Sequence, residues 1–191
     1  MADRKAPDYP LDPTLEFDQP EQYKALFDDT RLDIVALLLE RAATIKELAG
    51  TLGKPKGTIG HHVSVLEEAG LIHVVRTKMV RAIEAKYYGR TARTYLIGDY
   101  TGSGIDLAPD HFLTRAAAEF ARSNADAEVP PVSTVRYARI REERADEWVS
   151  RLTDLAQEFT AEERGGETTY GLLIAMYPTD RPHLPDEGGP R

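Results

Sequence analysis

The sequence predicts a mainly helical chain with a small amount of β-structure, that is, an α+β fold. Three patterns predict it: apolar residues recur at helical spacing between residues 20 and 70, two β-rich segments follow Gly70, and an amphipathic helix lies between two more β-rich segments in the last third. The 191 residues suit one large domain or two small ones. We expect a flexible arm at 1–19, a first domain at 20–100, an α+β module at 105–177 and a disordered tail at 178–191.

Composition limits the classes of protein to which this chain can belong. It contains no cysteine, which excludes disulfides, thiolate metal sites and a cysteine nucleophile and agrees with a reducing cytoplasm. The N-terminal residues lack the apolar core of a signal peptide, and no stretch approaches the roughly 20 apolar residues of a membrane span. We therefore expect a cytoplasmic protein that makes no membrane contact.

Charge is divided unevenly along the chain. The formal net charge is -8, yet the segment from Arg41 to Leu96 carries ten basic and four acidic side chains, a net charge of +6. The rest of the chain therefore carries -14. A basic segment in an otherwise acidic chain indicates a surface that could meet a polyanion.

Two helices are predicted before residue 42. The first is short and begins at Pro20 in PEQYKALFD. TRLDIVALLLERA forms the second, and Leu32, Val35, Ala36 and Leu39 are expected along its apolar stripe.

Two further helices meet across a short turn. In TIKELAGTLG, Thr44 and Glu47 have the spacing of a capping box, and Gly53 is placed to end the helix. The next helix is predicted over Pro55–Glu68 and is closed by Gly70.

Beyond Gly70, LIHVVRT and AIEAKYY are short and β-rich and flank KMVR, which predicts a two-stranded ribbon with a basic tip. Helix, turn, helix and basic ribbon is the order of a winged helix-turn-helix.

Two adjacent histidines, His61 and His62, lie in the middle of the last of these helices. Successive helical residues turn by about 100°, so the pair does not face a single metal ion. With Ile59 at the centre of the apolar face, His62 lies at the edge of that face and His61 on the opposite side. We interpret His62 as an imidazole that closes the edge of the core. His61 is interpreted as a contact to a base edge or a phosphate, with a plain solvated position as its alternative.

The same helix contains Gly57 and Gly60. Each glycine costs a helix roughly 1 kcal/mol relative to alanine. Their presence indicates that the helix approaches another surface closely, either a binding partner or a neighbouring helix of the same chain.

The run TIKELAGTLGKPKGTIGHHVSVLEEAGLIHVVRTKMVRAIEAKYYGRTA resembles the winged helix-turn-helix of ArsR-type transcriptional repressors. The matching motifs are ELA in the first helix, T-I-x-x-H-V where the family usually has T-V-S-x-H-L, and LEEAGLI before the wing. More loosely, KGT, KYY and the long C-terminal extension are similar to the larger regulators of this group, including archaeal heat-shock repressors. The resemblance covers roughly Leu15 to Leu96 and little of the last half.

The resemblance implies a homodimeric repressor of transcription bound to double-stranded DNA. Each subunit would place one recognition helix in successive major grooves of a pseudo-palindromic operator, with the wings over the flanking minor grooves or backbone. Lysines and arginines would mostly neutralise phosphates, whereas Thr58, His61 and Ser64 would read bases. The expected DNA contacts are Lys54, Lys56, Thr58, His61, Ser64, Arg76, Lys78 and Arg81.

Other functions find less support in the sequence. Metal-sensing members of the family use cysteines or clusters of His, Asp and Glu on a dimer helix, whereas this chain offers there only the adjacent Asp110 and His111. We expect no metal, no other cofactor and no enzymatic activity, because serine and histidine occur together only in HHVS and no phosphate loop is present. The alternative is a winged helix that binds another protein without reading DNA, which a face poor in lysine and arginine would favour.

The last half adds a module that we expect to serve dimerisation or sensing. It comprises a helix in APDHFLTRAAAEFARSNADA, a strand in VSTVRYARI, a helix in REERADEWVSRLTDLAQEFTAEER and a strand in TTYGLLIAMY. Two strands alone are marginal, so the sheet is expected to extend through the partner subunit or to pack on the helices. Dimer contacts are expected from Phe112, Leu113, Ala116 and Phe120. A pocket for a small apolar ligand, or simply core, is expected from Tyr137, Trp148, Phe159, Tyr170 and Met176.

Overall fold

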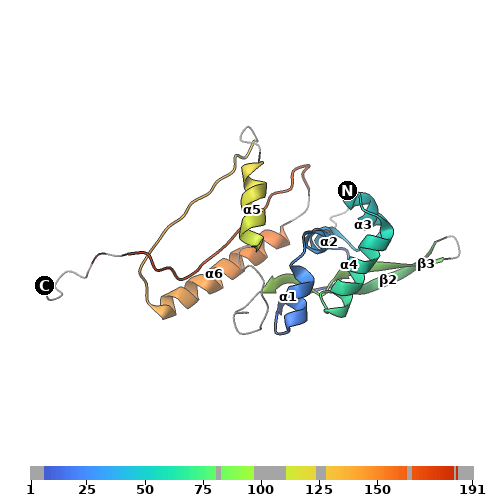
Figure 1. Cartoon of the computed structure of the whole chain (residues 1–191), viewed down its shortest axis with the longest axis horizontal. Coiled ribbons are helices and arrows are strands. Elements are labelled where there is room, and N and C mark those ends of the chain that lie inside the picture. Colours follow the sequence, from blue (N-terminus) through green and yellow to red (C-terminus); the bar gives the residue numbers. More distant parts are fainter. Residues whose placement is uncertain are drawn as a thin grey trace.

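The computed structural model describes residues 7–80, 83–96, 111–123, 128–162, 165–182 and 184. Four short helices and a β-hairpin form the N-terminal half, and the two remaining helices lie to one side of it (Figure 1). The elements in chain order are β1 (Asp12–Glu16), α1 (Pro20–Leu26), α2 (Asp29–Glu40), α3 (Ile45–Leu52), α4 (Lys56–Glu68), β2 (Ile72–Val80), β3 (Ile83–Arg90), β4 (Ala92–Leu96), α5 (His111–Ala121) and α6 (Glu142–Ala161). The α+β class is confirmed.

The apolar faces of the first four helices and the chain that follows α4 form one core. Its most deeply buried members come from α2, α4 and the turn before β2, and Ile34, Leu38, Ile59, Leu66 and Leu71 are all 0% exposed. Burial of such side chains contributes roughly 1.5–3 kcal/mol each relative to leaving them in water. This core fixes α4 from beneath and leaves its opposite face in solvent.

The apolar stripe that we expected on α2 is partly wrong. Ile34, Val35 and Leu38 are its buried apolar residues, whereas Ala36 is exposed and Leu32 is only half-buried. The helix packs against α4 and also against β3. Because α2 is covered on two sides, its buried residues are those that face α4 and β3. Helical spacing alone does not predict which residues these are.

Local signals in α3 and α4 are confirmed. The Thr44 hydroxyl accepts a hydrogen bond from the Glu47 N–H at 3.2 Å, and the Glu47 carboxylate accepts one from the Thr44 N–H at 2.8 Å, which completes the capping box. Gly53 ends α3 in the left-handed conformation, with φ of 62°. Gly70, with φ of 71°, turns the chain away from α4 in the same way.

Residues 7–17 are fixed against the rest of the chain, so the flexible arm expected at 1–19 is wrong for this stretch. β1 pairs in parallel with β4, and the pairing runs from Asp12 opposite Ala92 to Glu16 opposite Leu96. The next residue, Phe17, is 4% exposed. The residues before Pro20 are rich in proline and aspartate, a composition that predicts mobility. The prediction fails because their partner strand, β4, lies about eighty residues away along the chain, where no local pattern reveals it.

Tyr9 anchors this N-terminal segment in the core. Its ring is 8% exposed, and its hydroxyl donates to the Leu38 carbonyl at 2.5 Å and accepts from the Arg90 N–H at 2.9 Å. Gly89 makes room for the ring, because a Cβ at that position would lie 2.6 Å from Tyr9 and 2.8 Å from Val75. Tyr9 therefore joins the end of α2 to the base of the hairpin.

β2 and β3 form the predicted antiparallel ribbon, and it is longer than expected. The strands pair from Ile72 opposite Arg90 to Val80 opposite Ile83, with an irregularity in the register between Val74 and Arg76. The residues of KMVR that are described belong to β2. Figure 1 shows the hairpin extending away from the helices as a wing.

The C-terminal half differs from the expectation. The strands predicted in VSTVRYARI and TTYGLLIAMY are absent from the single chain: the described residues after α5 contain α6 and otherwise no helix or strand. Neither α5 nor α6 has a buried residue in the part of the chain that is described. The proposed boundary near residues 100–105 and most of the tail lie outside the described residues.

Among the described residues, none of the helices combines the length and the apolar character needed to cross a membrane.

Candidate nucleic-acid interface

One face of α4 is exposed along its whole length. Gly57, His61 and Ser64 lie on this face at spacings of four and three residues, and all three are exposed. Thr58 lies at its flank and is exposed as well. The opposite face is buried in the core, where Ile59, Val63 and Leu66 are 0–1% exposed.

Two lysines lie at the start of this face. Lys54 follows Gly53 in the turn, and Lys56 is the first residue of α4; both are exposed. No acidic residue lies in the first turn of α4. Its N-terminal end therefore combines two ammonium groups with the partial positive charge of the helix terminus, which favours an anion.

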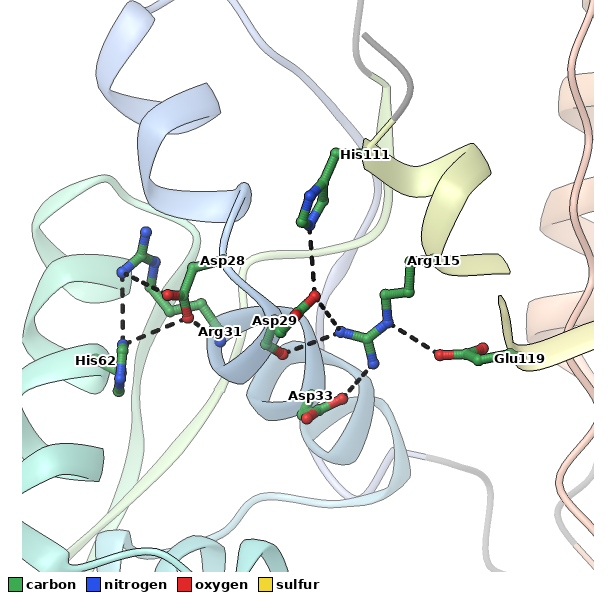
Figure 2. Close-up of polar contacts among 8 residues, drawn as sticks. All are labelled: Asp28, Asp29, Arg31, Asp33, His62, His111, Arg115 and Glu119. Atoms are coloured by element: carbon green, nitrogen blue, oxygen red, sulfur yellow. Dashed lines mark hydrogen bonds and ion pairs between the residues drawn. The ribbon is translucent and has the colours of Figure 1, made fainter. Parts of the chain in front are cut away.

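His62 faces the scaffold, as its position in the helix predicts. Figure 2 shows its ring beside Asp28 and Arg31, with Nδ1 3.6 Å from a carboxylate oxygen of Asp28 and 3.5 Å from a guanidinium nitrogen of Arg31. Burial lowers the pKa of His62, and the nearby Arg31 adds to this effect against the attraction of Asp28. The neutral ring is therefore favoured.

The same contacts fix α4 to the junction of α1 and α2. Asp28 caps α2 by accepting from the Arg31 N–H at 3.0 Å. The Arg31 guanidinium donates to the carbonyls of Lys24, at 2.9 Å, and Ala25 at the end of α1. His62 thus adds a polar contact between α4 and this junction, while its neighbour His61 is exposed to solvent.

The wing presents fewer available cations than its sequence suggests. Lys78 is exposed, but Arg76 is paired with the Asp8 carboxylate at 2.7 Å and lies over the Tyr87 ring at 4.9 Å. Asp8 also accepts from the Ala42 N–H at 2.7 Å. Burial alone would raise the pKa of Asp8, yet the hydrogen bonds from Ala42 and Arg76 lower it, so the ion pair persists at neutral pH.

Arg90 belongs to the core and cannot meet a partner. It is 6% exposed, its guanidinium lies 4.0 Å from the centre of the Tyr95 ring, and it donates to the carbonyls of Ala92 and Val35 at 2.9 and 3.4 Å. Burial lowers the pKa of Arg90, while Tyr95 and Tyr9 favour its charged form. The net charge of +6 therefore overstates the basic surface.

The eight expected DNA contacts separate into three groups. Arg76 is exposed but engaged by Asp8, and Arg81 lies outside the described residues. The remaining six are exposed on the turn, on α4 and on β2, and they are Lys54, Lys56, Thr58, His61, Ser64 and Lys78. Sequence reasoning missed Asp8 and Tyr9, because neither carries a local signal of its distant partner.

α5 is attached to α2 by a cluster of charged side chains (Figure 2). Arg115 donates to the Asp29 carboxylate at 3.3 Å and to the Asp33 carboxylate, and it pairs with Glu119 at 3.0 Å. His111 Nε2 lies 3.6 Å from Asp29. Among the described residues, no three His, Asp or Glu side chains are grouped closely enough to hold a metal ion.

The four expected dimer residues do not share one environment. Phe112 packs inside its own chain, with its ring 4.8 Å from that of Phe27, and Ala116 is half-buried. Leu113 is 40% exposed and Phe120 46% exposed. Phe112 is thus used to attach α5 to the N-terminal core, and only the other face of α5 is available to a partner.

The five residues expected to line an apolar pocket do not enclose one in the single chain. Each is 39–51% exposed, and two of them contact arginines through their rings: Arg181 lies 4.1 Å from Tyr137 and Arg151 4.3 Å from Trp148. The others are Phe159, Tyr170 and Met176.

The helix pair α3–α4, its turn at Gly53 and the β2–β3 hairpin define a winged helix-turn-helix protein. Residues 28–74 match the family described as bacterial regulatory protein, arsR family. This part of the chain is similar to that family, and its fold is a winged helix-turn-helix. The match begins at the cap of α2 and ends in β2, so it includes α4 and the start of the wing.

Similar proteins are found in bacteria and archaea. An uncharacterized HTH-type transcriptional regulator of Methanocaldococcus jannaschii, MJ1325, is 40% identical over 53 residues, which are 27% of this chain and 60% of that protein. The chain thus matches less than two thirds of the length of this relative. A homodimeric winged helix-turn-helix DNA-binding domain of Mb0332 from Mycobacterium bovis has 20% identity and a TM-score of 0.35, over 54% of this chain and 80% of that one. HlyU from Vibrio cholerae has 22% identity and a TM-score of 0.32, over 38% of this chain and 73% of that one.

Proposed function

We propose that this protein is a dimeric, sequence-specific DNA-binding regulator of transcription, acting as a repressor. The exposed face of α4 carries the proposal, because it presents polar residues and two lysines while the opposite face is buried. A helix of this size fits the major groove of B-DNA. The family match to residues 28–74 supports the same function.

In this proposal Thr58, His61 and Ser64 contact base edges. Lys54 and Lys56 neutralise phosphates at the N-terminal end of α4, and Lys78 does so from the wing. Phosphate contacts set the position on DNA and base contacts set the sequence preference. Two copies related by a two-fold axis would read the two halves of a pseudo-palindromic operator.

Selection of bound fragments from genomic DNA, followed by affinity measurements on the selected site, tests this function. We expect the logarithm of the affinity to fall with the logarithm of salt concentration, by about 0.9 for each phosphate contact. Lys56→Ala should lower affinity for all sequences, whereas His61→Ala should change which sequences are selected. A protein that selects no sequence, or whose affinity ignores salt, would contradict the proposal.

A protein-interaction module is the second candidate function. The pairing of Arg76 with Asp8 and the burial of Arg90 reduce the basic surface, which is the observation that favours it. Expression of a reporter gene placed behind the selected operator distinguishes the DNA-binding regulator from the protein-interaction module. If both the His61→Ala and Lys56→Ala variants lose repression, the result supports direct contact of α4 with DNA.

A further inference from the structure

Exposed apolar side chains are concentrated in the C-terminal half. Of the nineteen large hydrophobic residues that are exposed in the described chain, seventeen lie from Leu113 onward, and the other two, Met79 and Val80, lie in the wing. α6 carries four of them on 20 residues. A folded single chain rarely leaves so much apolar surface in water, so this half requires cover.

Two stretches of this half are extended and belong to no described helix or strand. Residues 132–140 and 168–177 contain neither helix nor strand, and Figure 1 draws both as extended chain without arrows. Among the described residues, no backbone N–H of 168–177 donates to a backbone carbonyl. A segment this rich in apolar side chains cannot be buried until its backbone groups have partners.

The composition of 168–177 is that of a central β-strand. TTYGLLIAMY contains no charged residue, and Pro178 ends it. Residues 132–140 also carry β-branched and aromatic side chains, but they include Arg136 and Arg139. Charged side chains are typical of an edge strand.

Neither segment belongs to a described sheet of the single chain. Its two described sheets are β1–β4 and β2–β3, and both belong to the N-terminal half. The 20-residue helix α6, about 30 Å long, separates 132–140 from 168–177 along the chain. Ile174 is the only half-buried residue of 168–177, so its neighbours remain exposed.

We propose that residues 168–177 pair as antiparallel strands with the same residues of a second copy of this chain, flanked by residues 132–140. A self-complementary strand satisfies the same backbone groups on both copies at once, which is the condition for a two-fold interface. Because the strand contains no charged residue, it has no electrostatic preference for a different protein of opposite charge. The apolar residues of α6 pack beneath the sheet. This inference rests on the homodimer of the proposed function but not on its DNA binding.

Hydrogen exchange of the full chain without DNA tests the strand pairing. We expect the amides of 168–177 to exchange at least about 100-fold more slowly than in an unstructured peptide, since strand pairing protects N–H groups that side-chain cover alone would not. This protection should decrease when the protein is diluted below its dimer dissociation constant. Rapid exchange of these amides in a stable dimer overturns the strand pairing and leaves the homodimer intact.

Charge substitution tests whether the partner is the same segment. Leu173→Lys and Leu173→Glu each place like charges near the two-fold axis, so each should weaken dimerisation by about 100-fold in sedimentation equilibrium. An equimolar mixture of the two variants should dimerise again, because opposite charges then face each other. Met79→Lys, at another exposed apolar position, on the wing, is the control and should leave the dimer unchanged.

Each outcome has a defined meaning. If both Leu173 variants dimerise as the parent chain does, or if their mixture does not recover the dimer, a second copy does not cover this segment in the way proposed. A parent chain that is monomeric overturns both the sheet and the homodimer. Protection of the α3 and α4 amides confirms that the variants are folded, and binding of α4 to DNA is measured separately.

Discussion

Gly57 lies on the exposed face of α4, in its first turn, and the fold does not require a glycine there. A Cβ at this position would meet nothing within 4 Å. At Gly60, a Cβ would lie 3.9 Å from the Ile45 side chain, which is ordinary van der Waals contact. Packing within the chain therefore explains neither glycine, and we infer that Gly57 allows close approach to a partner.

Gly57→Ala should stabilise the protein and weaken DNA binding. Alanine favours a helix by about 1 kcal/mol over glycine, so the midpoint of urea denaturation should rise. The added methyl group would occupy the space between α4 and the base edges, so operator affinity in fluorescence anisotropy should fall. Gly60→Ala faces the scaffold and should raise the midpoint with little change in affinity. Unchanged affinity for both variants would show that α4 does not approach DNA at Gly57.

His62 should make stability depend on pH in the mildly acidic range. Burial lowers its pKa in the folded protein below the value of 6.5 that it has when unfolded. The unfolded state then binds more protons, so the free energy of unfolding falls as pH drops below about 6.5 and levels off once the folded pKa has been passed. Urea denaturation at about pH 7.5 and about pH 5.5 measures the difference. His62→Gln should reduce the difference, whereas an equal pH dependence in that variant would place its origin elsewhere.

At the scale of elements, the N-terminal segment and the wing are coupled through the Asp8–Arg76 ion pair. This pair is exposed enough to exchange with solvent, with side-chain exposures of 41% and 40%. Exposed pairs typically contribute less than about 1 kcal/mol. A DNA phosphate could therefore take the place of Asp8 at small cost.

Asp8→Asn should release Arg76 for DNA. We expect tighter operator binding at low salt and a salt dependence steeper by up to about 0.9, the value for one additional phosphate contact. Glu84→Gln removes an exposed carboxylate from β3 of the same hairpin and controls for the general change in charge. Equal slopes for the two variants would mean that Asp8 acts only through net charge.

The elements differ in how far their sequence predicts them. The capping box at Thr44 and the glycine at the end of α3 act between neighbours, so α3 and α4 follow from the sequence, and so do the opposite directions of His61 and His62. β1 does not, because its stability depends on β4, far along the chain. A count of charges likewise ignores burial, so the net charge of +6 for residues 41–96 includes the buried Arg90.

At the scale of the whole molecule, the two halves differ in how they are stabilised. Every buried hydrophobic residue of the described chain lies between Tyr9 and Ala92. The C-terminal half is attached to it by Phe112 on Phe27, by the Arg115 cluster and by a few polar contacts of α6. The N-terminal half thus carries its own core, and in our proposal the C-terminal half is stabilised by association with a second copy.

A fragment of residues 1–96 should fold on its own and bind DNA poorly. Because its core is complete, we expect one cooperative thermal transition within about 5 °C of that of the full chain at low concentration. The fragment lacks α5, α6 and the extended segments, so it should sediment as a monomer and bind the operator at least about 100-fold more weakly, since two half-sites are no longer bound by one particle. The full chain at matched concentration is the control. A fragment that dimerises as tightly as the full chain would place the dimer contacts in the N-terminal half and remove the role assigned to the C-terminal module.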